Sequence, residues 1–240
     1  MTAALAIALR EFTAFFRLPV GWVVIALHTF LASVVIGLLV LEPGRPASMQ
    51  TFFALSGWML IPIAPAISMR LFSEEMRAGT IEPLLTSPVS DAGVVLGKFL
   101  GAAMFLAAML APTLVHAGVL WWASDPRPDP GPLFCGYLAL TLVGLAYLSV
   151  GTMVSALSSN QTLSFLATLF ALLLFMLGAG VGAQHAPLWL APTLNALAPA
   201  PRIADFARGV LDTSHVVYAL SVTAFFLALA HAALAARRWR

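Results

Sequence analysis

The chain has 240 residues, of which 61% are hydrophobic and only 9% are charged, and its mean hydropathy is +0.96. Soluble domains carry roughly 45–50% apolar and about 25% charged residues, so this composition excludes an ordinary soluble domain and indicates an integral membrane protein. The net charge of +2 is not gathered into a long basic run, which argues against nucleic-acid binding. The single cysteine excludes a disulfide framework within the chain and a cysteine-based zinc site.

The N-terminal segment, residues 1–18, is expected to form an amphipathic helix. Apolar side chains recur there at helical spacing, and two arginines fall on the opposite side: Leu5, Leu9, Phe12 and Phe16 against Arg10 and Arg17. Such a helix lies in the membrane interface instead of crossing the bilayer. The alternative interpretation is a short cytoplasmic extension of the first span.

Long stretches without any charge predict the membrane spans. A spanning helix needs about 20 apolar residues, and the polar run Ser158–Gln161 divides the longest uncharged stretch into two. We therefore expect an all-α integral membrane protein with six transmembrane helices, at about 20–41, 51–69, 94–122, 133–157, 163–183 and 216–236. Six spans place both termini on one side. Eight of the 12 Lys and Arg residues fall on that side, so the positive-inside rule predicts cytoplasmic termini.

The connection between the second and third expected spans, residues 70–93, is the most polar part of the chain. The stretch from Arg70 to Lys98 contains seven of the 22 charged residues. Gly79 suits the end of a short helix that continues from the second span. Thr80 suits the N-cap of another short helix, with Glu82 in its first turn.

Pro88 ends this second short helix, and Ser90 or Asp91 caps the third span. Between them, Ile81, Leu84 and Leu85 form an apolar patch bordered by charge. Such a patch at the inner face of a membrane protein predicts a docking site for a soluble partner. The alternative is an ordinary connecting loop that lies on lipid headgroups.

Segments along nearly the whole chain resemble the type-two ABC transporter permeases. The central one is FSEEMRAGTIEPLLTSPVSDAGVVLGKFLGA, and the others are REFTAFFRLPVGWVV, IPIAPAISMRLFSEE, SSNQ and RGVLDTSHVVYALSV. The sequence is most similar to the gliding-motility-associated branch and more distantly resembles the permease of nitrous oxide reductase maturation. One departure from the family pattern is Pro83, which stands where leucine is more common. A proline is tolerated in a first helical turn.

The resemblance implies a permease in the bacterial cytoplasmic membrane that dimerises with a second copy or a homologous permease. Two copies of a separate ATPase subunit would bind ATP and Mg²⁺, and this chain itself would hold no cofactor or metal and have no catalytic residue. A coupling helix between spans two and three would rest in a groove of that ATPase. The residues that the resemblance assigns to this coupling element are Glu74, Glu75, Arg77, Gly79, Thr80, Glu82, Leu84 and Leu85.

The sequence has no phosphate-binding loop of its own. That loop requires G-x-x-x-x-G-K-[ST], and the nearest match, Gly93–Phe99, has one residue too few between the glycines and Phe99 in place of Ser or Thr. The Glu-Glu-Met-Arg run at 74–77 resembles the motif of membrane CAAX-type proteases only superficially, because its arginine comes two residues early. The stronger alternative is an ABC-type mechanotransmitter, which drives an envelope machine without moving a substrate.

Further features inside the spans have mainly structural interpretations. Gly97 and Gly101 form a G-x-x-x-G pair, which we expect to serve packing within the subunit. Pro62, Pro65 and Pro112 predict bends. Three histidines fall in or near spans one, three and six: His28, His116 and His231. We expect neutral imidazole rings that are hydrogen-bonded to a carbonyl or a hydroxyl, and not a proton or metal relay.

The segment 184–215, between spans five and six, is expected outside the cytoplasm as a re-entrant or surface segment. Its apolar part is short and is interrupted by Pro192 and Pro199, so it cannot cross the bilayer. It would act either as an outer gate or as a lid over the bundle. Charged residues then follow at spacings of three and four, which predicts ion pairs along a helix or a dock for an extracytoplasmic partner: Arg202, Asp205, Arg208 and Asp212.

Overall fold

The computed structural model describes residues 3–41, 44, 47–80, 89–187 and 189–237, and within these ranges the chain forms helices and turns without any β-strand. Six helical segments are long and apolar enough to cross a membrane: Pro19–Val40, Gln50–Ala78, Asp91–Ala123, Pro130–Leu157, Gln161–Ala179 and Thr213–Ala236. The predicted all-α fold with six membrane-spanning helices is therefore confirmed.

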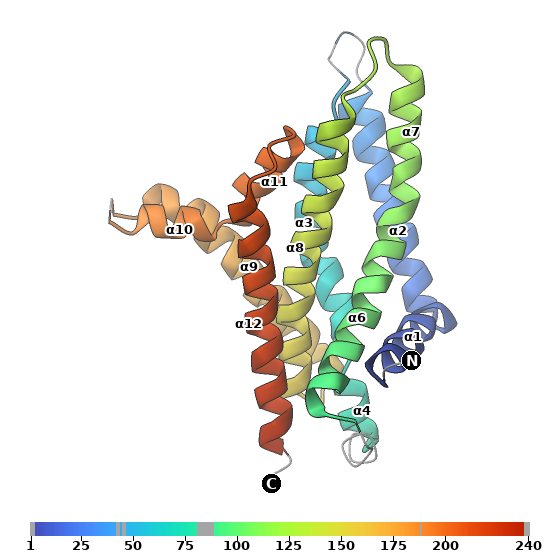
Figure 1. Ribbon diagram of the computed structural model, residues 1–240, viewed down its shortest axis with the longest axis vertical. Coiled ribbons are helices and arrows are strands. Elements are labelled where there is room, and N and C mark those ends of the chain that lie inside the picture. The colour runs from blue at the N-terminus through green and yellow to red at the C-terminus, as the bar shows by residue number, and fades with distance from the viewer. Residues whose placement is uncertain (1–2, 42–43, 45–46, 81–88, 188, 238–240) are drawn as a thin grey trace.

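Several of these segments comprise more than one helical element (Figure 1). In chain order the elements are α1 (Ala3–Arg17), α2 (Pro19–Val35), the π-turn η1 (Ile36–Val40), α3 (Gln50–Ser68), α4 (Ser73–Ala78), α6 (Asp91–Leu110), the 3₁₀ turn η2 (Ala111–Thr113), α7 (Leu114–Ala123), α8 (Pro130–Leu157), α9 (Gln161–His185), α10 (Ala191–Leu197), α11 (Pro199–Ala207) and α12 (Thr213–Arg237).

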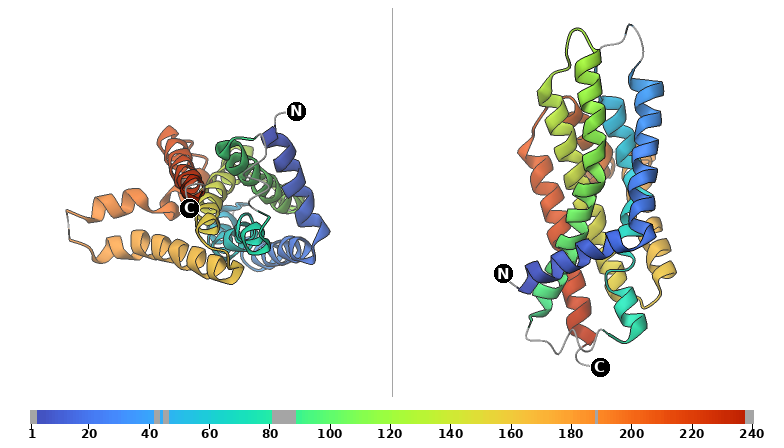
Figure 2. Two further views of the ribbon diagram at one scale, coloured as in Figure 1. Left: turned by 90° about the horizontal axis from the view of Figure 1, so that it is seen from below. Right: turned by 90° about the vertical axis from the view of Figure 1, so that its right-hand side faces the viewer.

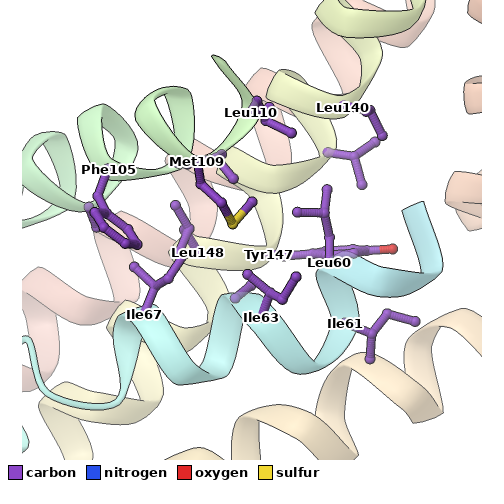
Figure 3. Close-up of a cluster of buried hydrophobic side chains, with 14 of the residues drawn as sticks. Leu60, Ile61, Ile63, Ile67, Phe105, Met109, Leu110, Leu140, Tyr147 and Leu148 are labelled. Carbon is purple, nitrogen blue, oxygen red and sulfur yellow. The ribbon is translucent and has the colours of Figure 1, made fainter. Parts of the chain in front are cut away.

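Helix α8 is the centre of the bundle, because it packs against α3, α6, α9, α11 and α12. Figure 3 shows the apolar core between α3, α6 and α8, where Leu60, Ile67, Phe105, Met109 and Leu148 point toward one another. All five side chains are almost fully buried. Since lipid is as apolar as these side chains, close van der Waals packing contributes more to this core than the exclusion of water does.

The prolines inside the spans have different consequences. Pro112 lies in η2, the 3₁₀ helix that joins α6 to α7, so the regular α-helix of the third span changes its geometry at this proline. Pro62 and Pro65 lie within α3, which stays a single helix from Gln50 to Ser68. The break in the second span comes instead after Ser68, between α3 and α4.

The segment between α9 and α12 forms an arm and a short helix that returns to the bundle. Helix α9 leans away from the bundle, with α10 folded beside it, as Figure 1 and the left view of Figure 2 show. Helix α11 packs back on α3 and α8.

The predicted row of ion pairs in this segment is largely wrong. Asp205 and Arg208 are 4.0 Å apart, but Arg202 stacks on a tyrosine ring instead of pairing with Asp205. Asp212 lies beyond the end of α11 and accepts a hydrogen bond from the Ser214 amide. Gly209, at φ +85°, ends the helical path before Asp212, which explains why Asp212 does not continue the row.

Both chain ends and α4 lie toward the same end of the molecule (Figure 1). Helix α1 lies across the long helices at this end, as the right view of Figure 2 shows, and it packs along α6. The three elements that carry most of the charge at this end, α1, α4 and the start of α6, are therefore neighbours, and they form the candidate site.

Candidate functional site

The short helix α4 has well-defined ends. Its first turn contains Glu74 and Glu75, where the helix dipole favours negative charge, and its last turn contains Arg77. Gly79, at φ +70°, takes the left-handed conformation, and the Thr80 amide donates to the Glu75 carbonyl at 3.0 Å. This is a Schellman cap, and it confirms the predicted end of the helix at Gly79. The Thr80 hydroxyl also donates to the Glu75 carbonyl, at 3.4 Å.

A buried serine of α8 holds the break between α3 and α4. The Ser155 hydroxyl oxygen accepts hydrogen bonds from the Phe72 and Ser73 amides at 3.1 and 3.2 Å, and the hydroxyl donates to the Met69 carbonyl at 3.1 Å. The Ser73 hydroxyl lies 2.7 Å from that of Ser164 on α9. Backbone groups freed by the break would be costly to bury without partners, so these serines allow the chain to turn inside the protein.

Four charged side chains from three helices form what we call the ion cluster: Arg10 and Glu11 of α1, Glu75 of α4 and Lys98 of α6. The Lys98 ammonium nitrogen is 2.9 Å from Oε1 of both Glu11 and Glu75. The Arg10 Nη2 atom is 2.8 Å from Glu11 Oε1 and 3.0 Å from Glu75 Oε1. Two positive and two negative groups therefore neutralise one another at the junction of α1, α4 and α6.

The ion cluster is mostly shielded from solvent. The Lys98 side chain is only 1% exposed, and those of Glu11 and Glu75 are 16% and 18% exposed. The Lys98 ammonium also lies 5.4 Å from the centre of the Phe72 ring, within the range of a cation–π contact. Burial raises the pKa of Glu11, but the Lys98 charge and the hydrogen bonds from Arg10 and Lys98 outweigh it and lower the pKa below its usual 4.5.

Two glycines allow α1 to lie close enough to α6 for the cluster to form. A Cβ atom on Gly97 would come within 2.7 Å of the Ala4 carbonyl oxygen, and one on Gly101 would come within 2.6 Å of Glu11 Cβ. The G-x-x-x-G pair thus allows α1 to pack closely on α6, which confirms the prediction that it serves packing within the subunit. The buried face of α1 includes Ile7 and Phe15, while Leu5 and Leu9 of the predicted apolar stripe are exposed.

The predicted coupling residues occupy different environments. Glu75 belongs to the ion cluster, and its Oε2 atom is buried without a hydrogen-bond partner. Glu74 pairs instead with Arg70, one turn earlier, at 2.7 Å. Arg77 is exposed at the end of α4.

The remaining predicted coupling residues, Glu82, Leu84 and Leu85, lie outside the described residues, as do Ile81, Pro83 and Pro88 of the same loop. Beyond the loop, Ser90 caps α6 by accepting a hydrogen bond from the Gly93 amide at 3.2 Å. The predicted start of the third span at Ser90 or Asp91 is therefore confirmed.

Sequence reasoning missed three of the four residues of the ion cluster and the serine that holds the break. The sequence places Arg10 on the polar side of the N-terminal helix, but it does not relate Arg10, Glu11 or Lys98 to Glu75. A carboxylate in an apolar helix and a lysine near the start of a span were the available signals, because each needs a partner when it is buried. The sequence contains no comparable signal for Ser155, which is one of several small polar residues in α8.

The intramembrane histidines do not come together. His116 Nε2 lies 2.8 Å from the Ser33 hydroxyl, as predicted. His28 is fully buried and neither ring nitrogen has a hydrogen-bond partner, so the predicted bond to a carbonyl or hydroxyl is wrong at this position. His231 is exposed on α12. Among the described residues, no three His, Cys, Asp or Glu side chains are grouped as metal ligands.

Comparisons with known proteins identify the family to which this bundle belongs. Residues 43–236 match the family described as ABC-2 family transporter protein, and the chain is therefore a member of that family, a permease. It is 27% identical over 120 residues to the probable multidrug ABC transporter permease YbhR of Escherichia coli strain K12 and equally to that of strain O157:H7. The alignment covers 49% of this chain and 32% of each relative, about a third of the relatives' length.

Proposed function

We propose that this chain is the membrane subunit of an ATP-driven transporter in the bacterial cytoplasmic membrane, with α4 and the loop after it as the element that contacts a separate ATPase subunit. The observation that carries this proposal is the ion cluster. It joins α4, which leads directly into the charged loop, to α1 by the Arg10–Glu75 contact at 3.0 Å and to α6 by the Lys98–Glu75 contact at 2.9 Å. A force on the loop would therefore move the ends of several helices together.

The charge distribution supports the direction of the proposal. The α4 end of the molecule also contains both chain ends (Figure 1), and the excess of Lys and Arg there supports the proposal that it is the cytoplasmic side, by the positive-inside rule. An ATPase subunit is found where ATP is, so this is the side from which it would approach. Arg77 is exposed there, and Leu84 and Leu85 complete the predicted contact.

The complex that we propose contains two ATPase subunits and a second permease, either another copy or a homologue. The ATPase subunits bind ATP and Mg²⁺. The sequence similarity of the 72–102 region supports the gliding-motility-associated branch as the finer assignment within the family. Lipid surrounds the spans, and an extracytoplasmic protein would bind at the segment 184–215, where Arg208 is exposed.

A second candidate function is that of a mechanotransmitter, which would use the same coupling element but move an envelope partner instead of a substrate. A closed, narrow interface between the two subunits with no continuous cavity would favour it, because a substrate would then have no path. Reconstitution with the ATPase separates the two functions. Transport requires ATP-dependent movement of a solute or lipid into or out of vesicles, whereas a mechanotransmitter hydrolyses ATP without such movement.

The coupling assignment can be tested with two pairs of substitutions in the permease co-expressed with the ATPase encoded beside it. The contact variant, Arg77→Glu with Leu84→Asp, should lose association with the ATPase in detergent. The strut variant, Glu75→Gln with Lys98→Met, keeps the ion cluster neutral and should still bind the ATPase. It should lose the effect of the permease on the ATPase rate, because α4 is no longer joined to α6.

A matched control is Arg17→Glu, which reverses another exposed arginine at the end of α1. It should change neither association nor rate. If the contact variant binds the ATPase as the wild type does, the docking surface lies elsewhere and the proposal is wrong. If the strut variant keeps the full effect on the ATPase rate, the ion cluster does not transmit the motion.

A further inference from the structure

An elongated apolar cavity of about 390 Å³ lies between α8, α9, α11 and α12. Its walls are formed almost entirely by aliphatic and aromatic side chains, among them Leu142, Val150, Leu172, Phe175 and Val222. Along α8 it extends from Ala139 to Met153, which is about 21 Å at the rise of an α-helix. Its volume falls within the range of ligand sites, and its shape and lining suit a hydrocarbon chain.

The polar side chains at the α11 end of this cavity gather around one guanidinium group. The Arg202 guanidinium carbon lies 3.7 Å from the centre of the Tyr218 ring. The Tyr218 hydroxyl is held in turn by donating to the Leu197 carbonyl at 2.6 Å. One Arg202 nitrogen donates to the Ala196 carbonyl, but its Nε is buried without a hydrogen-bond partner. All three side chains, Arg202, His215 and Tyr218, line the cavity.

Arg202 makes no ion pair within 4.0 Å in the described part of the chain, although Asp212 is near enough to interact with its charge. The nearby carboxylate, Asp205, lies 3.2 Å from His215 Nε2 and 4.0 Å from Arg208. Asp212 accepts a hydrogen bond from the Ser214 amide at 2.7 Å. No described carboxylate lies within 4.0 Å of Arg202. Because the Arg202 guanidinium lines the apolar slot, its planar set of donors is placed to bind a carboxylate or a phosphate.

We propose that this cavity binds an amphiphile that has a single hydrocarbon chain against α8, α9 and α12 and an anionic headgroup on Arg202. The slot is open enough for entry from the lipid, since Leu174 in its wall is 76% exposed. A neutral apolar compound would fill the slot but leave the guanidinium without its anion. This site goes beyond the proposed coupling function, because none of its residues belongs to α4 or to the ion cluster.

The site can be tested by photolabelling the full-length protein in detergent with a palmitic acid that carries a diazirine in mid-chain. Mass spectrometry should then locate the label within residues 139–153, 171–175 and 215–226. Palmitate should compete, and hexadecanol, which has the same chain without the charge, should compete about tenfold less well. Lysophosphatidylglycerol, which has one chain and a phosphate, serves as a third competitor and distinguishes a phospholipid headgroup from the carboxylate of a free fatty acid by which of the two displaces the label at lower concentration.

Two arginines of the same segment provide a matched pair of variants. Arg202→Gln should weaken labelling about tenfold, while Arg208→Gln, which removes an exposed arginine outside the cavity, should leave it unchanged. Arg202→Lys keeps the charge and should retain most of the labelling, so the comparison still decides the matter if Arg202→Gln fails to fold.

Three results would overturn the proposal. The first is labelling outside the cavity only. The second is equal competition by hexadecanol and palmitate, or equal labelling of the Arg202→Gln and Arg208→Gln proteins. Either result would show that binding does not depend on an anionic headgroup at Arg202. The third is an efficient disulfide between two copies of a Leu174→Cys variant, because a second subunit would then cover the slot. None of these results depends on ATPase binding, so they leave the coupling proposal untouched.

Discussion

Replacing Lys98 with methionine should destabilise the protein strongly, because it removes one cation from a neutral, shielded group of four charges. Methionine is close to lysine in length and suits the apolar part of the site. The loss leaves Glu11 and Glu75 facing each other with Arg10 as their only cation. Since each Oε1 atom lies 2.9 Å from the same nitrogen, both carboxylates would remain close together without the charge that holds them.

The magnitude follows from that geometry. Two oxygens that are each 2.9 Å from one nitrogen are at most about 5.8 Å apart, and two like charges at that separation repel by roughly 3 kcal/mol at an effective dielectric constant of about 20. Breaking a buried ion pair by removing one partner costs about 3–5 kcal/mol in general. Both side chains are less than a fifth exposed, so solvent reduces this figure only in part. We therefore expect a loss of about 3 kcal/mol.

A second substitution should reverse much of this loss. In the double variant Lys98→Met with Glu75→Gln, one cation and one anion are removed together, and the pair of Arg10 with Glu11 at 2.8 Å remains. The double variant should therefore be more stable than Lys98→Met alone, by about half of the loss. Such a non-additive result is typical of charges that belong to one network.

Thermal unfolding in detergent, followed by intrinsic fluorescence, measures the effect. A loss of about 3 kcal/mol lowers the Tm of a chain of this size by roughly 10 °C. Arg77→Met is the control, since Arg77 is exposed and makes no ion pair among the described residues. If Lys98→Met unfolds at the temperature of the control, or if the double variant is less stable than Lys98→Met, the ion cluster does not hold the three helices together.

Four further predictions test other parts of the site. Ser155→Ala should lower the free energy of unfolding by about 1–3 kcal/mol, because the buried Phe72 and Ser73 amides lose their acceptor. Hydrogen exchange at these two amides should become faster, and unchanged exchange would contradict the role of Ser155. Gly101→Leu should displace α1 from α6 and expose a new protease cleavage site near Arg17. If the variant is cleaved no faster than the wild type, the contact between α1 and α6 tolerates a side chain at this position. Gly79→Ala should lower stability by about 1 kcal/mol, because φ +70° is unfavourable for alanine, and an unchanged Tm would argue against the cap. The pKa of Glu11 is lower in the folded protein than its usual 4.5, so the stabilisation by its carboxylate is complete above pH 4.5 and is lost as the pH falls through the lower folded value. The Tm of Glu11→Gln should therefore approach that of the wild type below pH 4.5. A difference in Tm that stays constant with pH would contradict the lowered pKa.

Much of the fold could be predicted from where charge is missing. A membrane span must be apolar over its whole length, so uncharged stretches mark the spans in this sequence almost directly. Helix ends can also be predicted where a single residue determines them, as at Gly79 and Ser90. These signals are local, and each needs only its own neighbours in the sequence.

The connections between distant segments could not be predicted in the same way. Glu11 meets Glu75 and Lys98 across 64 and 87 positions of the chain, and no periodicity relates them. Ser155 was equally hidden, because a serine that closes a buried break has the same sequence signature as one that bonds its own helix. His28 shows the opposite failure, since the expected hydrogen-bond partner of this buried ring is missing.

Two kinds of contact hold α4, and their difference indicates how a push from the loop would travel under the proposed function. On the α8 side, Ser155 bonds three backbone groups of the break between Met69 and Ser73, which fixes the position of the turn itself. On the other side, ion pairs hold α4 by long side chains, which keep their attraction over small displacements because Coulomb energy falls slowly with distance. The break is therefore suited to act as the pivot, while α1 and α6 follow α4 through the ion cluster. Weakening the ion cluster should uncouple the helices and leave the turn in place, whereas weakening Ser155 should loosen the turn itself.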